Sequence, residues 1–165
     1  MVDLSKGIEG AKRFLPVSYP DVYSRISLVK GDFFESVSSG GDNYILKYIL
    51  HDWSDENAIE ILQKVATALQ ATQQVTLKPP SVLIIEHLYD FPPIHAHVAF
   101  VDMTMLGILG RERSQAEFEE VMRKAGLKLV QVHQTRSTVV ILEAQLAYWT
   151  DTWLFSEHSK ELLKG

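Results

Sequence analysis

Short apolar runs rich in β-branched residues alternate along the chain with segments whose apolar residues recur at helical spacing. That alternation predicts an α/β domain built on a mostly parallel sheet. The run Val82–Ile85 is apolar on both faces, which is typical of a central strand covered by helices on each side. Strands are expected at 26–30, 43–48, 81–86, 127–134 and 137–145.

Two helices are well marked by their ends. The first is predicted to begin at Ser54, a favourable N-cap residue, and its apolar residues keep helical spacing as far as Leu69. The second is predicted to open with Ser114 and Glu117, a capping-box pair, and to stop at Gly126, a residue type common just past a helix end. Loops are expected at 72–80 and 90–97.

Polar side chains follow successive strands of the predicted sheet. Ligands of open parallel sheets bind outside the carboxyl ends of the strands, so these side chains are expected to meet at one rim. The candidates are Asp3 after a strand stub at Met1–Val2, Asp32 in the run Gly31–Phe34, then Lys47, His51 and Asp52, and finally Glu86.

Each candidate also has a purely structural interpretation. Asp32 after Gly31 is compatible with a plain turn, and a single histidine such as His51 is more often structural. Glu112 lies in a charged cluster that exposure to solvent would explain. Glu86 is harder to explain in this way, because an unpaired carboxylate beside a core is costly.

Composition narrows the functional classes. The chain has 165 residues, of which 46% are apolar and 22% charged, as expected for one soluble globular domain. The net charge of −5 without a Lys/Arg block argues against nucleic acid as a partner, and no apolar run suggests a membrane span. Cysteine is absent. His95 and His97, with His87 upstream, suggest metal ligands, but no further ligand lies at suitable spacing, so no metal is predicted. We expect a cytoplasmic enzyme.

The segment Ile45–Glu56 has the sequence ILKYILHDWSDE, which resembles the LKxxLHDWxDE signature of the plant and fungal small-molecule O-methyltransferases. That group includes the caffeic acid and acetylserotonin methyltransferases and fungal polyketide methyltransferases. The likeness covers roughly residues 1–146. Supporting matches follow in the same order at Asp3-Leu4, Ile8-Glu9, Gly31–Phe34, Ile84–Glu86, Asp102–Leu106, Glu112–Ser114 and Ala125–Leu127.

The resemblance implies a Rossmann-like methyltransferase sheet with an antiparallel last strand, S-adenosylmethionine as methyl donor, and a small hydroxylated, phenolic acceptor. It makes His51 the general base, with Glu86 and Glu112 holding the imidazole, and it requires no metal. The cofactor-binding residues that it implies are Asp3, Asp32, Phe33 and Lys47, and the substrate-binding residues are Met105 and Asp52.

The chain departs from the family pattern at both ends. No counterpart is found for the family's first strand with its glycine-rich loop, or for the amino-terminal helical domain through which the family forms homodimers. We therefore expect a partial methyltransferase domain over 1–146, with a helix at Ser5–Arg13 that has little to pack against. An extension over 147–165 is predicted to be helical, either folded on the domain or free to contact a partner or a membrane surface.

Two other functions stay open. The chain is alternatively a catalytically silent relative that serves as a binding or dimerisation module. A nicotinamide-dependent oxidoreductase on a similar sheet is disfavoured, because no Gly-x-Gly-x-x-Gly motif occurs and the histidine signature fits methyl transfer better.

Overall fold

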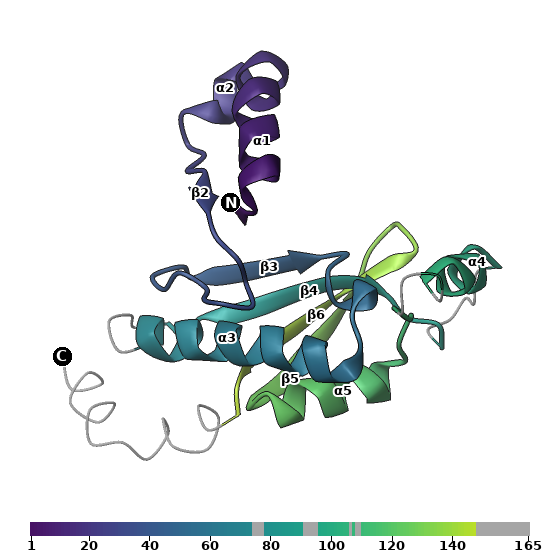
Figure 1. Cartoon of the computed structure of the whole chain (residues 1–165). Coiled ribbons are helices and arrows are strands. Elements are labelled where there is room, and N and C mark those ends of the chain that lie inside the picture. The colour runs from purple at the N-terminus through teal and green to yellow at the C-terminus, as the bar shows by residue number, and fades with distance from the viewer. Residues whose placement is uncertain (74–77, 91–95, 106, 108–109, 148–165) are drawn as a thin grey trace, which may run out of the picture. The chain divides into compact units, whose positions relative to one another are not determined.

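The computed structural model describes residues 1–73, 78–90, 96–105, 107 and 110–147 (Figure 1). These residues form two compact units, one over Met1–Val37 and one from Ser38 onward, and each is described by itself. Both contain helices and strands, so the predicted α/β class is confirmed. The predicted 147–165 helix lies, apart from Ala147, outside the described residues. None of the described helices has both the length and the apolar content that a bilayer span requires.

The first unit is a two-stranded parallel sheet whose strands are joined by two helices. Strand β1 (Val2–Asp3) pairs with β2 (Val29–Lys30), and the chain between them forms α1 (Ser5–Ser18) and α2 (Pro20–Tyr23). Within α1 only Ile8 is buried, as expected for a helix with little to pack against. The helix predicted at Ser5–Arg13 was too short, because α1 continues to Ser18. Helix α2, which has proline in its first turn, was not predicted.

The second unit is built on a four-stranded mixed sheet. Its strands are β3 (Asn43–Lys47), β4 (Ser81–His87), β5 (Leu127–Gln134) and β6 (Val139–Leu146). In space the order is β3–β4–β6–β5, with β3 parallel to β4 and β6 antiparallel to both of its neighbours. The strands β3, β4 and β5 therefore run in one direction, and the last strand of the chain is the antiparallel one, as predicted.

Two helices of this unit follow the predicted periodicity. Helices α3 (Asp55–Gln73) and α5 (Gln115–Lys124) pack against each other and against the sheet (Figure 1). The capping box of α5 is complete, because Ser114 Oγ accepts from the Glu117 amide and the Glu117 carboxylate accepts from the Ser114 amide. Gly126 follows the helix with a φ of 81°, a left-handed conformation that glycine adopts without strain.

The boundaries of the predicted loops need correction. Helix α3 continues into the expected 72–80 loop, because the buried Thr72 hydroxyl donates to Ala68 O at 2.8 Å and accepts from Gly40 N at 2.7 Å. The expected 90–97 loop also ends early, since α4 (Ala96–Met105) begins within it. Helix α4 buries only Val98, so it lacks the one-sided apolar pattern that marks α3 and α5.

Strand β4 is the central strand, as predicted, but its two faces differ. Val82, Ile84 and Glu86 on one face are fully buried, whereas Leu83 and Ile85 on the other face are half-buried. Ser81 and His87 on that second face are buried, so it is covered at both ends of the strand and partly covered in the middle. The two faces differ because α3 and α5 pack against one another, which places both on the same side of the sheet.

The described strands pair within two sheets, one of two strands and one of four. Strands β1 and β2 pair with each other, and among the described residues β3 has β4 as its one strand partner. The expectation of one rim served by four strands concerns both units and stays a prediction. The rim of the second unit lies where β3 and β4 end side by side, at Lys47 and His87.

Replacing Ser114 by alanine removes the acceptor for the Glu117 amide. We expect the free energy of unfolding to fall by about 1 kcal/mol, the usual cost of losing an N-cap side chain. Ser114→Thr keeps the hydroxyl and is the matched control. Urea denaturation followed by circular dichroism measures both variants, and an alanine variant as stable as the threonine variant would contradict the capping role.

Candidate active site

The chain turns sharply where β3 ends. Tyr48 has a φ of 52°, a left-handed conformation that is uncommon for any residue other than glycine. A short 3-10 turn, η1 (Leu50–Asp52), follows and buries Leu50 and His51. Backbone strain of this kind tends to cluster at functional sites. The strained turn therefore places His51 at the carboxyl edge of the sheet.

Glu112 holds the ring of His51. Nδ1 of His51 lies 2.9 Å from Oε1 of Glu112, and both side chains are buried. An ionised carboxylate can only accept a hydrogen bond, so in the neutral ring the proton is on Nδ1 and the lone pair is on Nε2. This contact leaves Nε2 as the basic atom of the ring.

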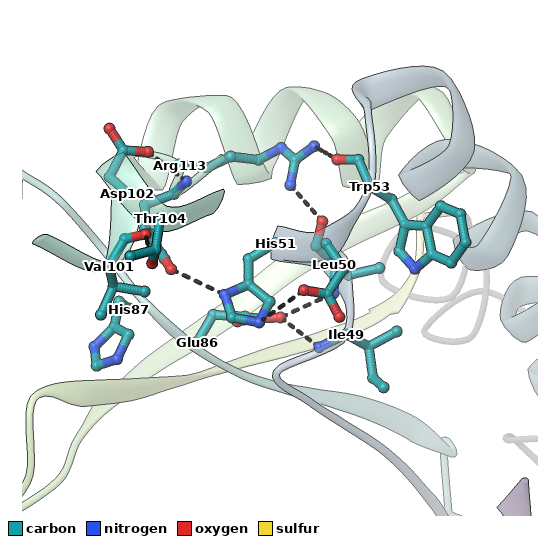
Figure 2. A network of polar contacts seen from close by, with 12 residues as sticks. Ile49, Leu50, His51, Trp53, Glu86, His87, Val101, Asp102, Thr104 and Arg113 are labelled. Carbon is teal, nitrogen blue, oxygen red and sulfur yellow. Dashed lines mark hydrogen bonds and ion pairs between the residues drawn. The ribbon is translucent and has the colours of Figure 1, made fainter. Parts of the chain in front are cut away.

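Glu86 holds the backbone beside the ring (Figure 2). Its Oε1 accepts from Ile49 N at 3.0 Å and from Leu50 N at 2.9 Å. Its Oε2 lies 4.0 Å from His51 Nδ1 and has no hydrogen-bond partner among the described residues. The pKa of this carboxyl is raised to about 7, chiefly by burial and also by the charge of Glu112, whereas the charge of His51 and the two amides oppose the rise.

The surroundings of His51 favour its charged form. Its pKa is raised above the ordinary value, chiefly by the hydrogen bond to Glu112; burial opposes this, and the charges of Glu86, Glu112 and Asp52 add to it. Asp52 Oδ1 lies 3.5 Å from Nε2, and its side chain is partly exposed. Asp52, which the sequence predicted to bind the substrate, therefore lies beside Nε2 of His51.

The segment before α5 packs tightly against the histidine turn. A Cβ added at Gly110 would come within 2.2 Å of His51 O, so the two backbones approach as closely as glycine allows. Arg111 N donates to that carbonyl at 2.9 Å. Asp102 Oδ1, from α4, accepts from Glu112 N at 2.8 Å. This segment thus fixes both the turn and the carboxylate that faces it.

Arg113 is a site residue that the sequence did not reveal. Its side chain is fully buried, and its guanidinium donates to Leu50 O at 2.7 Å and to Trp53 O at 2.8 Å (Figure 2). Arg111 and Arg113 flank Glu112 symmetrically in the sequence. No local signal separates the buried arginine from its partly exposed neighbour, whose side chain pairs with Glu117.

Three predicted cofactor residues belong to the first unit. The Oδ1 atom of Asp3 accepts from Leu4 N at 2.7 Å, at the exposed end of β1. Asp32 Oδ1 accepts from Phe34 N at 2.9 Å, which is the turn contact that a purely structural interpretation predicts. The half-buried ring of Phe33 lies against that of Phe34, with centroids 5.1 Å apart. Their roles toward a cofactor stay predictions.

The other two predicted ligand contacts belong to the second unit. Lys47 is exposed at the end of β3, with Nζ 5.4 Å from the centroid of the Tyr48 ring. That ring lies in turn 5.6 Å from the ring of His51. Met105 is half-buried at the end of α4, where its carbonyl accepts from Gly110 N at 3.0 Å. Both residues thus lie on elements adjoining the histidine turn.

One group of side chains has the composition of a metal site. Ligand atoms of His51, Glu86 and Glu112 lie within 4.8 Å of one another. Nδ1 of His51 is, however, already engaged by Glu112 at hydrogen-bond distance. Of the histidines considered from the sequence, His87 is buried and its Nδ1 lies 3.1 Å from Thr138 O, whereas His95 lies outside the described residues.

Solved structures define the class to which this fold belongs. Mitomycin 7-O-methyltransferase MmcR matches with a TM-score of 0.77 at 31% identity, over 88% of this chain and 41% of that one. NcsB1, an O-methyltransferase from neocarzinostatin biosynthesis in complex with S-adenosyl-L-homocysteine and 1,4-dihydroxy-2-naphthoic acid, matches with a TM-score of 0.73 at 30% identity, over 88% and 40%. The fold is that of the small-molecule O-methyltransferases.

The profile of the O-methyltransferase domain matches residues 1–128, and the chain belongs to this family, as its signature suggested. Mitomycin biosynthesis 6-O-methyltransferase of Streptomyces lavendulae is 39% identical over 107 residues, which are 64% of this chain and 28% of that protein. Caffeic acid 3-O-methyltransferase of Zinnia elegans is 34% identical over 127 residues, or 74% and 35%. The chain spans about a third of the length of such relatives.

Glu86→Gln keeps a side-chain oxygen for the Ile49 and Leu50 amides but removes the titration. The folded-state pKa of Glu86, about 7, lies above its ordinary value of 4.5, so the wild type loses stability as pH rises between these values. We expect the variant's advantage in free energy of unfolding to grow across that window, to about 3 kcal/mol above pH 7.

Denaturation curves at several pH values measure this advantage. The matched control is Glu60→Gln, at an exposed carboxyl of α3, for which we expect no such trend. An advantage for Glu86→Gln that stays constant from acid to neutral pH would show that the carboxyl does not titrate in this range.

Proposed function

We propose that this chain is the catalytic part of an S-adenosylmethionine-dependent O-methyltransferase that methylates a hydroxyl of a small phenolic molecule, with His51 as general base. The observation that carries the proposal is the buried contact of His51 with Glu112, in a chain that belongs to the O-methyltransferase domain family. The contact leaves the opposite ring nitrogen, Nε2, free of the proton that Glu112 holds on Nδ1.

The chemistry requires such a base. A phenol with a pKa of about 10 is mostly protonated at neutral pH, and its oxygen must carry negative charge to attack a methyl carbon. Nε2 takes the hydroxyl proton as the oxygen attacks, and Glu112 stabilises the imidazolium that forms. A positioned base of this kind contributes about 10²–10⁴-fold, and alignment of the reacting atoms supplies much of the remainder.

S-adenosylmethionine supplies the electrophilic methyl group when bound, and the first unit offers side chains of the right chemistry to hold it. Asp3 presents a carboxylate suited to ribose hydroxyls, and a Cβ at Gly7 would come within 2.3 Å of its Oδ2, so the glycine makes room for that carboxylate. Asp32 and Phe33 offer an acceptor and an aromatic face for the adenosine. In the second unit, Lys47 at the end of β3 is a further predicted cofactor contact, by its match to the family signature.

The acceptor is inferred to be a small hydroxylated aromatic compound. Met105, half-buried at the end of α4, is proposed to contact its ring, and Asp52 lies beside the nitrogen that takes its proton. The naphthoic acid in the NcsB1 complex and the caffeic acid in the name of the Zinnia elegans relative support this class of acceptor.

His51→Ala removes the base but no proposed cofactor contact. With a protein containing this chain, we expect methyl transfer to a panel of phenols to fall at least 10²-fold, while the affinity for S-adenosylhomocysteine stays within twofold. Radiolabelled methyl transfer and calorimetric titration measure the two quantities. The matched control is His133→Ala, which removes a partly exposed histidine that also pairs with a glutamate, Glu143, on the sheet.

The outcomes separate the competing functions. A wild-type protein that neither binds S-adenosylhomocysteine nor methylates any phenol would favour the silent binding module. Cofactor binding that is lost in His51→Ala would mean that this residue holds the cofactor and is not the base. In the active protein, kcat should rise with pH through a pKa above 6.5, because the proton must leave Nε2.

The proposed route uses no metal, although the buried His51, Glu86 and Glu112 side chains resemble a ligand set. We expect exhaustive dialysis against EDTA to leave turnover within twofold of the untreated protein. Turnover is measured before and after dialysis, with a parallel sample to which Zn²⁺ is returned. Activity that disappears on dialysis and returns with Zn²⁺ would replace the general-base route by a metal-assisted one.

A further inference from the structure

A buried guanidinium lies directly behind the histidine turn. The side chain of Arg113 has no exposed surface, and it comes from the residue next to Glu112 in the chain. Burying a charged group is costly unless the fold pairs it fully. The charge of Arg113 must therefore be paired by other groups within the fold.

Its hydrogen bonds join the two ends of the turn. Nη1 donates to Leu50 O at 2.7 Å and Nη2 donates to Trp53 O at 2.8 Å (Figure 2). Nε donates to Asp55 Oδ1 at 2.9 Å. The planar fork of arginine suits three acceptors arranged in this way, and the single ammonium of lysine does not. The first helical residue of α3 is thus tied to both carbonyls that bracket His51.

The opposite side of the turn is held by a group of opposite charge. Glu86 accepts from the amides of Ile49 and Leu50, so the turn lies between a carboxylate that binds its amides and a guanidinium that binds its carbonyls. Glu112, next to Arg113, reaches the ring itself. Adjacent residues of one segment therefore fix the backbone of the turn and the orientation of its side chain.

We propose that Arg113 is a positioning residue for the proton transfer, which sets where the His51 ring lies relative to Glu112 by holding the carbonyls of Leu50 and Trp53. This inference rests on the proposed function of His51. Without the fork, those two carbonyls lose their donor, the turn relaxes, and the contact of Nδ1 with Glu112 lengthens. The catalytic ring then loses its fixed tautomer while every group that touches the reactants is still present.

Arg113→Lys tests the inference, because it keeps the charge and most of the volume while losing the fork. The first readout is nitrogen-15 NMR of the imidazole in the full chain without cofactor. We expect the Nδ1–H tautomer to lose its dominance and the pKa of His51 to fall, since the hydrogen bond to Glu112 is the main cause of its elevation. The charged groups facing the ring, Glu86, Glu112 and Asp52, are unchanged.

Three further variants calibrate this result. Arg123→Lys changes an exposed arginine of α5 that pairs with Glu120, and we expect the wild-type tautomer and pKa. Glu112→Gln gives the spectrum of a ring without its carboxylate. Asp55→Asn weakens the ionic partner but keeps the guanidinium, and we expect a smaller change in the same direction. Asp55→Asn decides the matter should Arg113→Lys fail to fold.

Kinetics in the active protein supply a second readout. We expect Arg113→Lys to lower kcat by about 10- to 100-fold, the usual effect of misplacing a catalytic group by about 1 Å, with the affinity for S-adenosylhomocysteine unchanged. A folded variant with the wild-type tautomer, His51 pKa and kcat would overturn the inference. Arg113 would then serve only as a structural link between η1 and α3. An altered imidazole spectrum in a protein without methyl transfer would instead show that Arg113 orients the ring, while refuting the proposed function and with it the link to proton transfer.

Discussion

The site depends on one constraint: a buried stretch of backbone must have its polar groups paired although water does not reach it. Leu50 is fully buried and His51 nearly so. Their backbone partners come from elsewhere in the fold, from Glu86 on β4 and from the segment 111–113 before α5. The sheet and the capped helix must therefore both be in place before the histidine turn has a defined shape.

The sequence predicted those parts whose causes are local. The capping box before α5, the apolar periodicity of α3 and the position of β4 each depend on residues close together in the chain, and each is found. The histidine signature identified the family, because it contains the turn, His51 and the start of α3 in one stretch. The extent of α3 was missed, since its last turn is held by contacts of Thr72 with Gly40 and Tyr44.

What the sequence could not give are features that arise from distant pairings. Arg111 and Arg113 have similar neighbours in the sequence. Arg111 pairs with the nearby Glu117, whereas Arg113 binds Leu50, Trp53 and Asp55, about sixty residues earlier in the chain. Helix α4 was not predicted, because its apolar residues are not gathered on one side of the helix. Of its side chains, only Val98 is buried.

The two glutamates near His51 are unequal, and the inequality suits a base that must gain and lose a proton. Glu112 lies at hydrogen-bond distance from the ring and raises the pKa of His51. Glu86 instead accepts hydrogen bonds from backbone amides. Its pKa is raised to about 7, chiefly by burial. A positive charge on His51 lowers the pKa of Glu86. A charged His51 therefore favours the ionised form of Glu86, and burial opposes it.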